Sequence, residues 1–222
     1  MNTRFISAEL HCHTRYSPDS LMKIQALLLA CRKKGIDKVA VTDHNRLEGA
    51  LKAYELAPEQ VVVGEEIQTT QGEILGYFLS EEIPAGLEPM EVVRRLRAQK
   101  AFISVAHPFD PYRGSHWQAG TLQSLAPFLD GIEVFNARCV ESAFNQQARA
   151  FARDLGIPEM VGSDAHSTFE LGRAVLHLPD FNSADDLRTA LRSSQQKTQR
   201  SGSYVHLIST WAKLVKRASN AE

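Results

Sequence analysis

The stretch AELHCHTRYSPDS, residues 8 to 20, places two histidines one residue apart at the point where an apolar run ends and a turn-like segment begins. Side chains alternate between the two faces of an extended strand, so His11 and His13 share one face while Cys12 points the other way. Two imidazoles on one face can bind one metal ion. For this stretch alone, the alternative is a pair of solvated histidines at a strand end.

Short β-branched runs that end in polar residues recur along the chain. They are FISAEL, DKVAV, QVVVG, AFISVA, GIEVF and EMVGS, which begin at residues 5, 37, 60, 101, 131 and 159. Helical patterns over residues 20–35, 89–100 and 140–156 lie between them, and Gly35 and Gly156 are placed to end two of these helices. The recurring order of strand, polar tip and helix predicts an α/β barrel whose active groups gather at the carboxyl ends of parallel strands.

The composition describes one globular domain that spans residues 1–222. Apolar residues make up 43% of the chain, charged residues 23%, and the formal net charge is -1, which gives no global basic bias toward nucleic acid or anionic membrane. The three cysteines are widely spaced, which argues against a disulfide framework and predicts a reducing, cytoplasmic compartment. No stretch approaches 18 uninterrupted apolar residues, so no membrane segment is expected. Two amphipathic patterns in about residues 183–218, the first with Ser183 as its N-cap, are expected to form helices outside the barrel.

The polar residues at the six strand ends would converge if the strands close into a barrel. Burying that many histidines and carboxylates without partners costs free energy, and a cluster of metal ions removes that cost. Imidazole and carboxylate ligands without an inward thiolate suit Zn²⁺, Mn²⁺ or Fe²⁺ and do not suit a cysteine-bound structural zinc. The sequence therefore predicts a catalytic centre that uses divalent ions.

Six motifs occur in an order that resembles a known family. They are HCHTRYSPDS, VTDH, GEE, AHP, EVFNAR and GSDAH, and they cover about residues 8 to 175. Through them the chain resembles the PHP (polymerase and histidinol phosphatase) family of metal-dependent phosphoesterases. The resemblance implies a distorted seven-stranded (β/α) barrel that holds two or three divalent ions, with hydrolysis of a phosphate ester as the usual reaction.

The resemblance also implies a set of ligands for three ions. His11 and His13 would bind the first ion, with Asp164 completing its shell and Glu66 bridging to the second ion. His107 would be a ligand of the second ion. The ligands of the third ion would be Asp19, His44 and His166.

The ligand shell of the second ion departs from the family pattern. Where the family often has a histidine on the strand after the bridging glutamate, GEILGYF offers Glu73, which is either a carboxylate ligand or the mark of a looser site. Strand alternation allows only one of Glu65 and Glu66 to face inward, and the family spacing selects Glu66. Asp43 points away on the same rule, so it is expected to orient a ligand rather than bind an ion.

Three further residues are candidates for binding substrate. Arg15 follows the first histidine pair, and Asn136 and Arg138 follow a later strand end, where a guanidinium group can bind phosphate. The alternatives are a solvated loop position for Arg15 and a structural role for Asn136. Basic residues in the last helical pattern are expected to form a solvated face rather than a strong nucleic-acid patch: Lys213, Lys216 and Arg217.

The predicted reaction is hydrolysis of a phosphate ester by a metal-bound hydroxide, because divalent ions lower the pKa of bound water toward ~7 and neutralise charge on phosphoryl oxygens. Asp164, His166 or metal-bound water would protonate the leaving group. The expected substrate is a small phosphorylated metabolite, a nucleotide or a short oligonucleotide. One alternative is a C–N bond hydrolase of the amidohydrolase type, although no strand end offers its bridging lysine. The other is a non-catalytic module that binds metal and ligand to regulate a partner.

Overall fold

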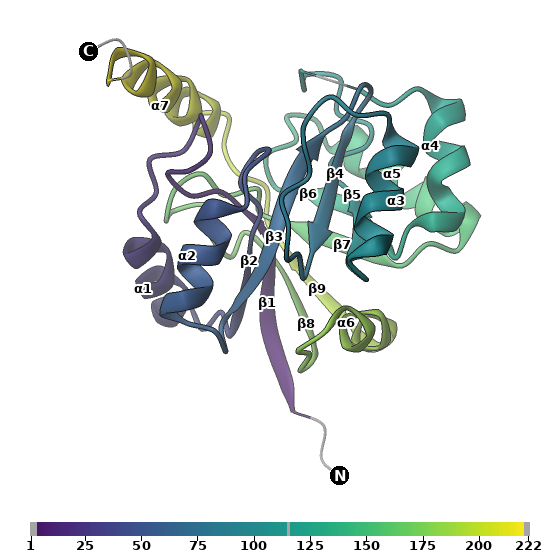
Figure 1. The fold of residues 1–222 in the computed structure, drawn as a ribbon, viewed down its shortest axis with the longest axis horizontal. Helices are drawn as coiled ribbons and strands as arrows, with labels where there is room; N and C mark the ends of the chain where they lie inside the picture. The colour runs from purple at the N-terminus through teal and green to yellow at the C-terminus, as the bar shows by residue number, and fades with distance from the viewer. Residues whose placement is uncertain (1–3, 115, 220–222) are drawn as a thin grey trace.

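A single mixed sheet of nine strands organises the fold (Figure 1). The computed structural model describes residues 4–114 and 116–219. The order of the strands in the sheet is β7-β6-β5-β4-β3-β2-β1-β8-β9, so the first seven are neighbours in both sequence and space. The strands are β1 (Phe5–Cys12), β2 (Lys38–Val41), β3 (Val61–Gln68), β4 (Glu73–Tyr77), β5 (Phe102–Val105), β6 (Gly131–Asn136), β7 (Glu159–Gly162), β8 (Ala174–Pro179) and β9 (Gln195–Thr198).

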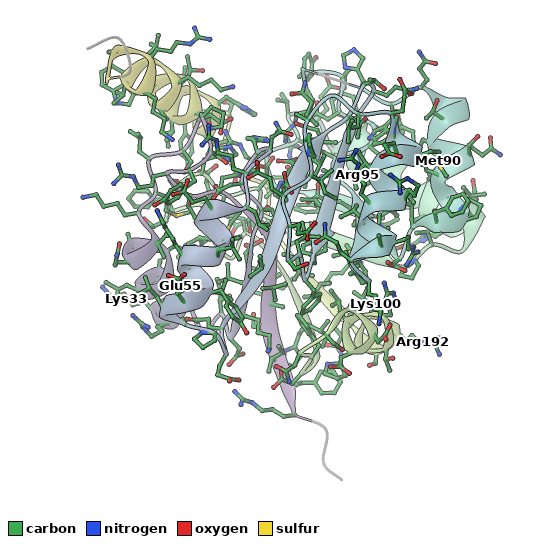
Figure 2. All side chains as sticks on the ribbon, in the orientation of Figure 1. Lys33, Glu55, Met90, Arg95, Lys100 and Arg192 are labelled. Carbon is green, nitrogen blue, oxygen red and sulfur yellow. The ribbon has the colours of Figure 1, made fainter. Side chains whose placement is uncertain are left out.

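Helices flank this sheet on its outer faces. Helices α1 and α2 lie on one side and α3, α4 and α5 on another, while α7 stands apart near the loop that follows β1 (Figure 1). Lys33 on α1 and Glu55 on α2 lie on the solvent side of their helices (Figure 2). The helices are α1 (Ile24–Lys34), α2 (Glu48–Leu56), α3 (Pro89–Ala98), α4 (Ala119–Leu125), α5 (Ser142–Leu155), α6 (Ala184–Ala190) and α7 (Val205–Ser219).

The sheet curls until the carboxyl ends of β1 and β7 meet. Ala165, which follows β7, pairs in parallel with Cys12 at the end of β1. The His13 amide donates to the Ala165 carbonyl at 2.8 Å, and the Ala165 amide donates to the His11 carbonyl at 3.3 Å. The strand ends that carry the predicted ligands are therefore fixed against each other by main-chain hydrogen bonds.

Strand β8 separates the amino ends of β1 and β7. It pairs antiparallel with the first residues of β1, and its Ala174 amide donates to Ser163 Oγ, just after β7, at 2.8 Å. The buried Glu9 carboxylate on β1 accepts hydrogen bonds from the amides of Ser163 and Gly172, each at 3.0 Å. The seven-stranded barrel is therefore closed at its carboxyl end and split by β8 at its amino end, which accounts for its distortion.

Strand β4 runs antiparallel to its neighbours β3 and β5. Only residues 69–72 join β3 to β4, and so short a segment permits a hairpin but not the crossover of a dozen or more residues that a parallel pair needs. The other neighbouring pairs between β1 and β7 are parallel. Inside the barrel, the Tyr77 hydroxyl of β4 donates to the Leu10 carbonyl of β1 at 3.0 Å.

The predicted α/β barrel is confirmed, and several predicted helix ends lie where the sequence places them. Helices α1 and α5 end at Gly35 and Gly156, whose φ angles of 67° and 66° lie in the left-handed region that glycine favours. Ser183 caps α6 by accepting a hydrogen bond from the Asp186 amide at 3.1 Å. The sequence patterns do not predict α2, α4, β8 or β9. No described helix is both long and apolar enough to span a membrane.

Glu65 and Glu66 occupy opposite faces of β3, as alternation requires. The Glu65 carboxylate is buried away from the predicted ligands and accepts a hydrogen bond from the Ile83 amide at 3.0 Å, while its Oε1 has no hydrogen-bond partner in the described chain. Burial raises the pKa of Glu65 to about 8. The folded protein then keeps a proton that the unfolded chain releases near pH 4.5, so the free energy of unfolding falls as the pH rises from about 5 to 8.

We therefore expect Glu65→Gln to be more stable than the wild type at pH 8.5, by more than about 1.4 kcal/mol, and close to it at pH 5. A glutamine keeps the acceptor for Ile83 and removes the ionisation. Urea unfolding at both pH values measures this, with the exposed Glu55→Gln on α2 as control. An equal difference from wild type at the two pH values would contradict the assigned protonation.

Candidate metal centre

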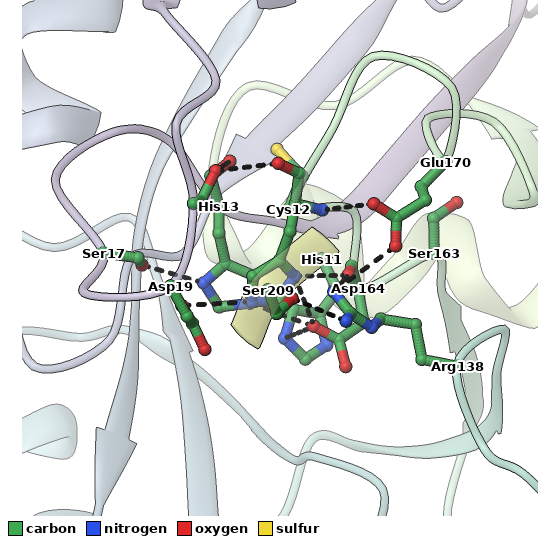
Figure 3. A network of polar contacts seen from close by, with 12 residues as sticks. His11, Cys12, His13, Ser17, Asp19, Arg138, Ser163, Asp164, Glu170 and Ser209 are labelled. Carbon is green, nitrogen blue, oxygen red and sulfur yellow. Dashed lines mark hydrogen bonds and ion pairs between the residues drawn. The ribbon is translucent and has the colours of Figure 1, made fainter. Parts of the chain in front are cut away.

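Nine histidine, aspartate and glutamate side chains gather at the carboxyl end of the barrel. They come from the ends of six strands and from the loop after β1, so the barrel topology itself brings them together. Figure 3 shows part of this cluster from close by. The nine are the predicted ligands His11, His13, Asp19, His44, Glu66, Glu73, His107, Asp164 and His166.

Four of these side chains converge on one point. The Nε2 atoms of His11 and His13 each lie 3.3 Å from Glu66 Oε2. The same nitrogens lie 3.7 and 3.1 Å from Asp164 Oδ1. All four side chains are buried. Two imidazoles and two carboxylates at these separations form a candidate ligand set for the first ion.

Glu66 also reaches a second group of side chains. Its Oε1 lies 2.9 Å from His107 Nε2, and Glu73 Oε2 lies 3.5 Å from the same nitrogen. Glu66 therefore lies between the two groups, as a bridging ligand must. Glu73 points from β4 into the cluster, which supports its assignment as a carboxylate ligand in place of the family's histidine.

Asp19 connects the two remaining imidazoles. Its Oδ1 lies 3.2 Å from His166 Nε2, and its Oδ2 lies 3.5 Å from His44 Nε2. The other ring nitrogen of His44, Nδ1, lies 3.0 Å from Glu66 Oε2 and 3.8 Å from Glu73 Oε1. His44 thus lies between the second and third groups, whereas the resemblance places it with the third group alone.

Glu133 on β6 is a buried carboxylate that orients the cluster, and sequence reasoning missed it. Its Oε1 accepts a hydrogen bond from His11 Nδ1 at 2.9 Å, and its Oε2 accepts one from the His107 amide at 2.8 Å. With Nδ1 bonded to Glu133, Nε2 is the nitrogen of His11 that faces the cluster, and it can bind an ion once it is unprotonated. Gly162 provides the space, since a Cβ there would lie 2.1 Å from Glu133 Oε1. A glutamate inside the apolar run GIEVF is the signal that sequence analysis could have used.

A second hydrogen-bonded chain orients His13. Its Nδ1 lies 3.0 Å from Ser17 Oγ, and the Ser17 hydroxyl donates to Asp43 Oδ1 at 2.9 Å. The serine oxygen therefore accepts a hydrogen bond from His13 Nδ1–H. His13 Nε2 is then the unprotonated nitrogen, and it faces the cluster. Asp43 also accepts hydrogen bonds from the Thr14 amide and hydroxyl, both at 2.6 Å. Asp43 therefore orients the candidate ligand His13 through Ser17 and does not itself face the cluster, as strand alternation predicts.

Asn136 is buried, and its amide group supports the cluster instead of facing substrate. The Nδ2 atom donates to Glu133 Oε2 at 2.9 Å and to Asp164 Oδ2 at 3.2 Å. The Oδ1 atom accepts a hydrogen bond from the Arg138 amide at 2.9 Å. Both ends of the side-chain amide are engaged. Asn136 thus has the structural role that was the alternative to binding substrate, and it positions Glu133 and Asp164.

Burial and neighbouring charges shift the pKa values of the cluster. Although burial opposes it, the carboxylates of Glu66, Glu133 and Asp164 raise the pKa of His11 well above its usual value, so an ion bound there would displace that proton. Burial and two neighbouring imidazoles lower the pKa of His13 to about 3, so its ring is neutral at physiological pH. Although burial opposes it, the Arg113 guanidinium helps to hold the pKa of Asp164 well below its usual range. Burial and the charge of Glu66 raise the pKa of Glu73. Repulsion between these two carboxylates is what a cation between them would relieve.

Three buried atoms that could coordinate a metal ion have no hydrogen-bond partner among the described residues: His11 Nε2, Asp19 Oδ1 and Glu66 Oε2. An unsatisfied buried polar group costs about 1–3 kcal/mol. A divalent ion is a partner that imidazole nitrogens and carboxylate oxygens can share. The donor set therefore fits divalent ions.

Arg138, expected to bind phosphate, anchors α7 to the barrel. Its buried guanidinium donates to Ser209 Oγ at 2.7 Å and to the Val205 carbonyl at 3.1 Å, and it lies 3.3 Å from Glu170 Oε1 (Figure 3). Its Nη atoms are bonded within the protein, while Nε has no hydrogen-bond partner among the described residues and the side chain borders the depression over the cluster. Arg138 therefore fixes α7 beside the cluster.

The guanidinium that does reach the cluster belongs to Arg113, in the loop after β5. It donates to Asp164 Oδ2 at 2.6 Å and to Asp110 Oδ2 at 3.1 Å. Arg113 lines, together with Asp19 and Glu73, an open depression of about 480 Å³ over the cluster. Sequence reasoning missed it because a loop arginine has no periodic signal, and only the fold brings it to the strand ends.

Arg15 lies outside this depression. Its side chain is exposed and lines an adjacent groove, next to Tyr16 and Arg46. Arg15 is therefore exposed on a loop beside the nine ligands rather than within the depression over them.

Comparison with known proteins assigns the class to which this fold and cluster belong. The chain matches the PHP domain model over residues 9–111 and the PHP-associated model over residues 143–195. It is 39% identical over 145 residues to an uncharacterized protein of Methanocaldococcus jannaschii, MJ1587, in a match that covers 60% of this chain and 82% of the relative. The chain belongs to the PHP family.

Solved structures share the fold at low sequence identity. PsfC from Pseudomonas syringae PB-5123 is similar with a TM-score of 0.70 and 16% identity, over 96% of this chain and 99% of that one. The lesion-specific endonuclease PfuEndoQ from Pyrococcus furiosus is similar with a TM-score of 0.62 and 17% identity, over 87% of this chain and 58% of that one. At these identities the likeness concerns the fold alone.

We expect the purified protein to carry at least two divalent transition-metal ions per chain, because nine candidate ligands exceed the roughly four that one tetrahedral ion uses. Elemental analysis by mass spectrometry measures the content. His107→Ala should lose about one ion while keeping its circular dichroism spectrum, since His107 faces only the second group. His177→Ala, an exposed histidine on β8, is the matched control. Less than one ion per chain without chelator, and no gain with Mn²⁺ or Zn²⁺, would exclude the cluster.

Proposed function

We propose that the protein is a metal-dependent phosphoesterase that uses the nine-residue cluster to hold two or three divalent ions, of Zn, Mn or Fe. The observation that carries this proposal is that one depression holds both a set of metal-binding side chains and a guanidinium group. The side chains are imidazoles and carboxylates with unpartnered donor atoms, and the guanidinium is that of Arg113, which faces them. Cations and a guanidinium on one cavity wall suit a phosphate group, which carries close to two negative charges as a monoester.

When bound, divalent ions supply a nucleophile from water near neutral pH and offset charge on the phosphoryl oxygens. The chain's own residues orient the reacting groups. The Glu133 and Asp43 carboxylates keep His11 and His13 in the orientations described above. Arg113 places a guanidinium charge at the mouth of the cluster, where it can attract phosphoryl oxygens, although its Nε and Nη2 already bond to Asp110 and Asp164.

Asp164 and His166 are the two residues proposed to take part in catalysis. The Asp164 carboxylate accepts hydrogen bonds from Arg113 and Asn136, and its low pKa keeps it ionised, so it cannot donate a proton. His166 donates its Nδ1 proton to the Asp164 carbonyl at 2.8 Å. We therefore assign Asp164 to ligation. His166 could protonate the leaving group only with a proton on Nε2, so as a ligand through Nε2 it leaves that role to water in the depression.

Two alternative functions, a C–N hydrolase and a regulatory module, would require different residues at this end of the barrel. A C–N hydrolase of the amidohydrolase type would have a bridging lysine at a strand end, and the cluster contains none among the described residues. The lysine of β2, Lys38, lies at the opposite end, where it binds Asn182 Oδ1 at 2.8 Å. A regulatory module would bind metal without turnover. Neither reading accounts for an arginine directed at the ligands.

The test is release of p-nitrophenol from p-nitrophenyl phosphate by the purified protein. We expect turnover that a chelator abolishes and that Mn²⁺ or Zn²⁺ restores. Metal binding without turnover of any phosphate ester would favour the regulatory module, and metal-dependent cleavage of an amide in its place would favour the amidohydrolase reading.

Arg113→Ala should lower kcat/KM for p-nitrophenyl phosphate at least ~10-fold, about 1.4 kcal/mol, with the metal content unchanged. Arg113→Lys should restore only part of this, because an ammonium lacks the paired donors. Arg153→Ala, an exposed arginine of α5 paired with Glu159, is the matched control. Wild-type kcat/KM in Arg113→Ala would remove Arg113 from substrate binding, and loss of metal would give it a structural role.

A further inference from the structure

A second groove runs beside the depression over the cluster. It has a volume of about 1030 Å³ and lies between α7 and the loops that follow β1 and β2. The two cavities share Pro18, His44, Asn45 and Lys213 as lining residues, so one opens into the other. Lys213 Nζ lies 3.6 Å from Asp19 Oδ2, which places the start of the groove at a candidate metal ligand.

The groove is strongly basic. Among the described residues that line it, Glu48 alone carries a carboxylate, and Lys52 Nζ lies 2.6 Å from Glu48 Oε1. Arg46 and Arg217 are exposed, and no ion pair or hydrogen bond engages their guanidinium groups within the described residues. The basic residues of the lining come from three separate segments: Arg15, Arg46, Lys213, Lys216 and Arg217.

The arrangement of these side chains is fixed by the fold. Lys216 on α7 donates to the Arg15 carbonyl at 2.5 Å and also to the Ser17 carbonyl, which joins α7 to the loop after β1. Arg138 holds the first turns of the same helix at Val205 and Ser209. The helix is therefore fastened at two places, and its basic face forms one wall of a groove whose other wall carries Arg46.

We propose that this groove binds a linear chain of phosphates, so that the substrate carries further phosphates beyond the one that is hydrolysed. This rests on the proposed function, because the scissile phosphate would occupy the cluster while the following ones lie between Lys213, Arg217 and Arg46. A small monophosphate would leave these charges unused. The sequence places the basic residues of α7 on a solvated face, and the fold adds Arg15 and Arg46 to them to make a continuous cationic surface.

A phosphodiester chain and inorganic polyphosphate share this chemistry. Tyr16 lines the groove, but the Lys52 ammonium lies over its ring at 4.9 Å from the centroid and the ring packs against the core, so it does not decide between the two chains.

The test compares chains of matched length and different charge on the metal-loaded protein. We expect a fluorescent 5′-phosphorylated trinucleotide to bind at least 10-fold more tightly, by anisotropy, than the same trinucleotide with neutral methylphosphonate linkages. Arg46→Ala/Arg217→Ala should lose this preference while kcat/KM for p-nitrophenyl phosphate stays within about twofold of wild type. Arg32→Ala/Arg192→Ala, two exposed arginines outside the groove, is the control.

Salt dependence gives an independent measure. Each phosphate contact on a single strand contributes about 0.7 to the slope of log affinity against log salt concentration, so the groove variant should have a slope shallower by about 1.4. Competition by tripolyphosphate as strong as that of the trinucleotide would identify a general polyphosphate chain, which keeps the proposal.

Three results would overturn the proposal, and they are distinct from failure of the phosphoesterase assay because the readout is binding rather than release of product. The first is equal binding of the charged and neutral trinucleotides. The second is an unchanged preference in Arg46→Ala/Arg217→Ala. The third is binding of phosphatidylserine vesicles in place of the trinucleotide, since α7 also exposes Leu207, Trp211 and Leu214 and such a helix can bind an anionic membrane.

Discussion

The Glu66 carboxylate is the group on which the other side chains at this end of the barrel depend. Its two oxygens lie within 3.3 Å of ring nitrogens from four histidines, which come from the ends of three other strands. Its main chain is fixed as well, because its amide donates to the Asp43 carbonyl at 3.3 Å and its carbonyl accepts from the Asn45 amide at 2.9 Å. A buried carboxylate so surrounded needs nearby positive charge. The convergence of the strand ends places the groups that can hold such a charge around it.

The sequence predicts the barrel because strand order and helix ends depend on local patterns, whereas the candidate ligand set follows from the family resemblance. Alternation along a strand decides that His11 and His13 share a face and that only one of Glu65 and Glu66 points inward. The family spacing selects Glu66, which lies in the cluster. What depends on contacts between distant segments is not predictable in this way. Arg138 has the side chain and the sequence position expected of a phosphate ligand. Its guanidinium instead donates to Val205 and Ser209 of α7, almost seventy residues further along the chain. Arg113 reaches the cluster only through the path of a loop, which no periodicity describes.

The main chain is strained where two of the candidate ligands stand. His107 and Asp164 have φ angles of 27° and 52°, in the left-handed region that residues with a Cβ seldom adopt. Such conformations cost about 1–3 kcal/mol each and persist where surrounding contacts determine them. Here the Glu133 carboxylate binds the His107 amide, and Arg138 Nη1 lies 3.4 Å from the Asp164 carbonyl. Residues that bind no ion themselves therefore maintain the conformation of residues that are placed to do so.

The candidate ligands and the basic groove have different origins in the fold. The ligands belong mainly to strand ends, whose positions follow from the closure of the sheet, while the basic residues belong to two surface loops and to α7. Loops and exposed helix faces tolerate substitution far better than strand ends packed around a buried cluster. Related barrels can therefore diverge in what they recognise, through changes along α7 and the loops after β1 and β2, while the constellation of buried ligands stays as it is.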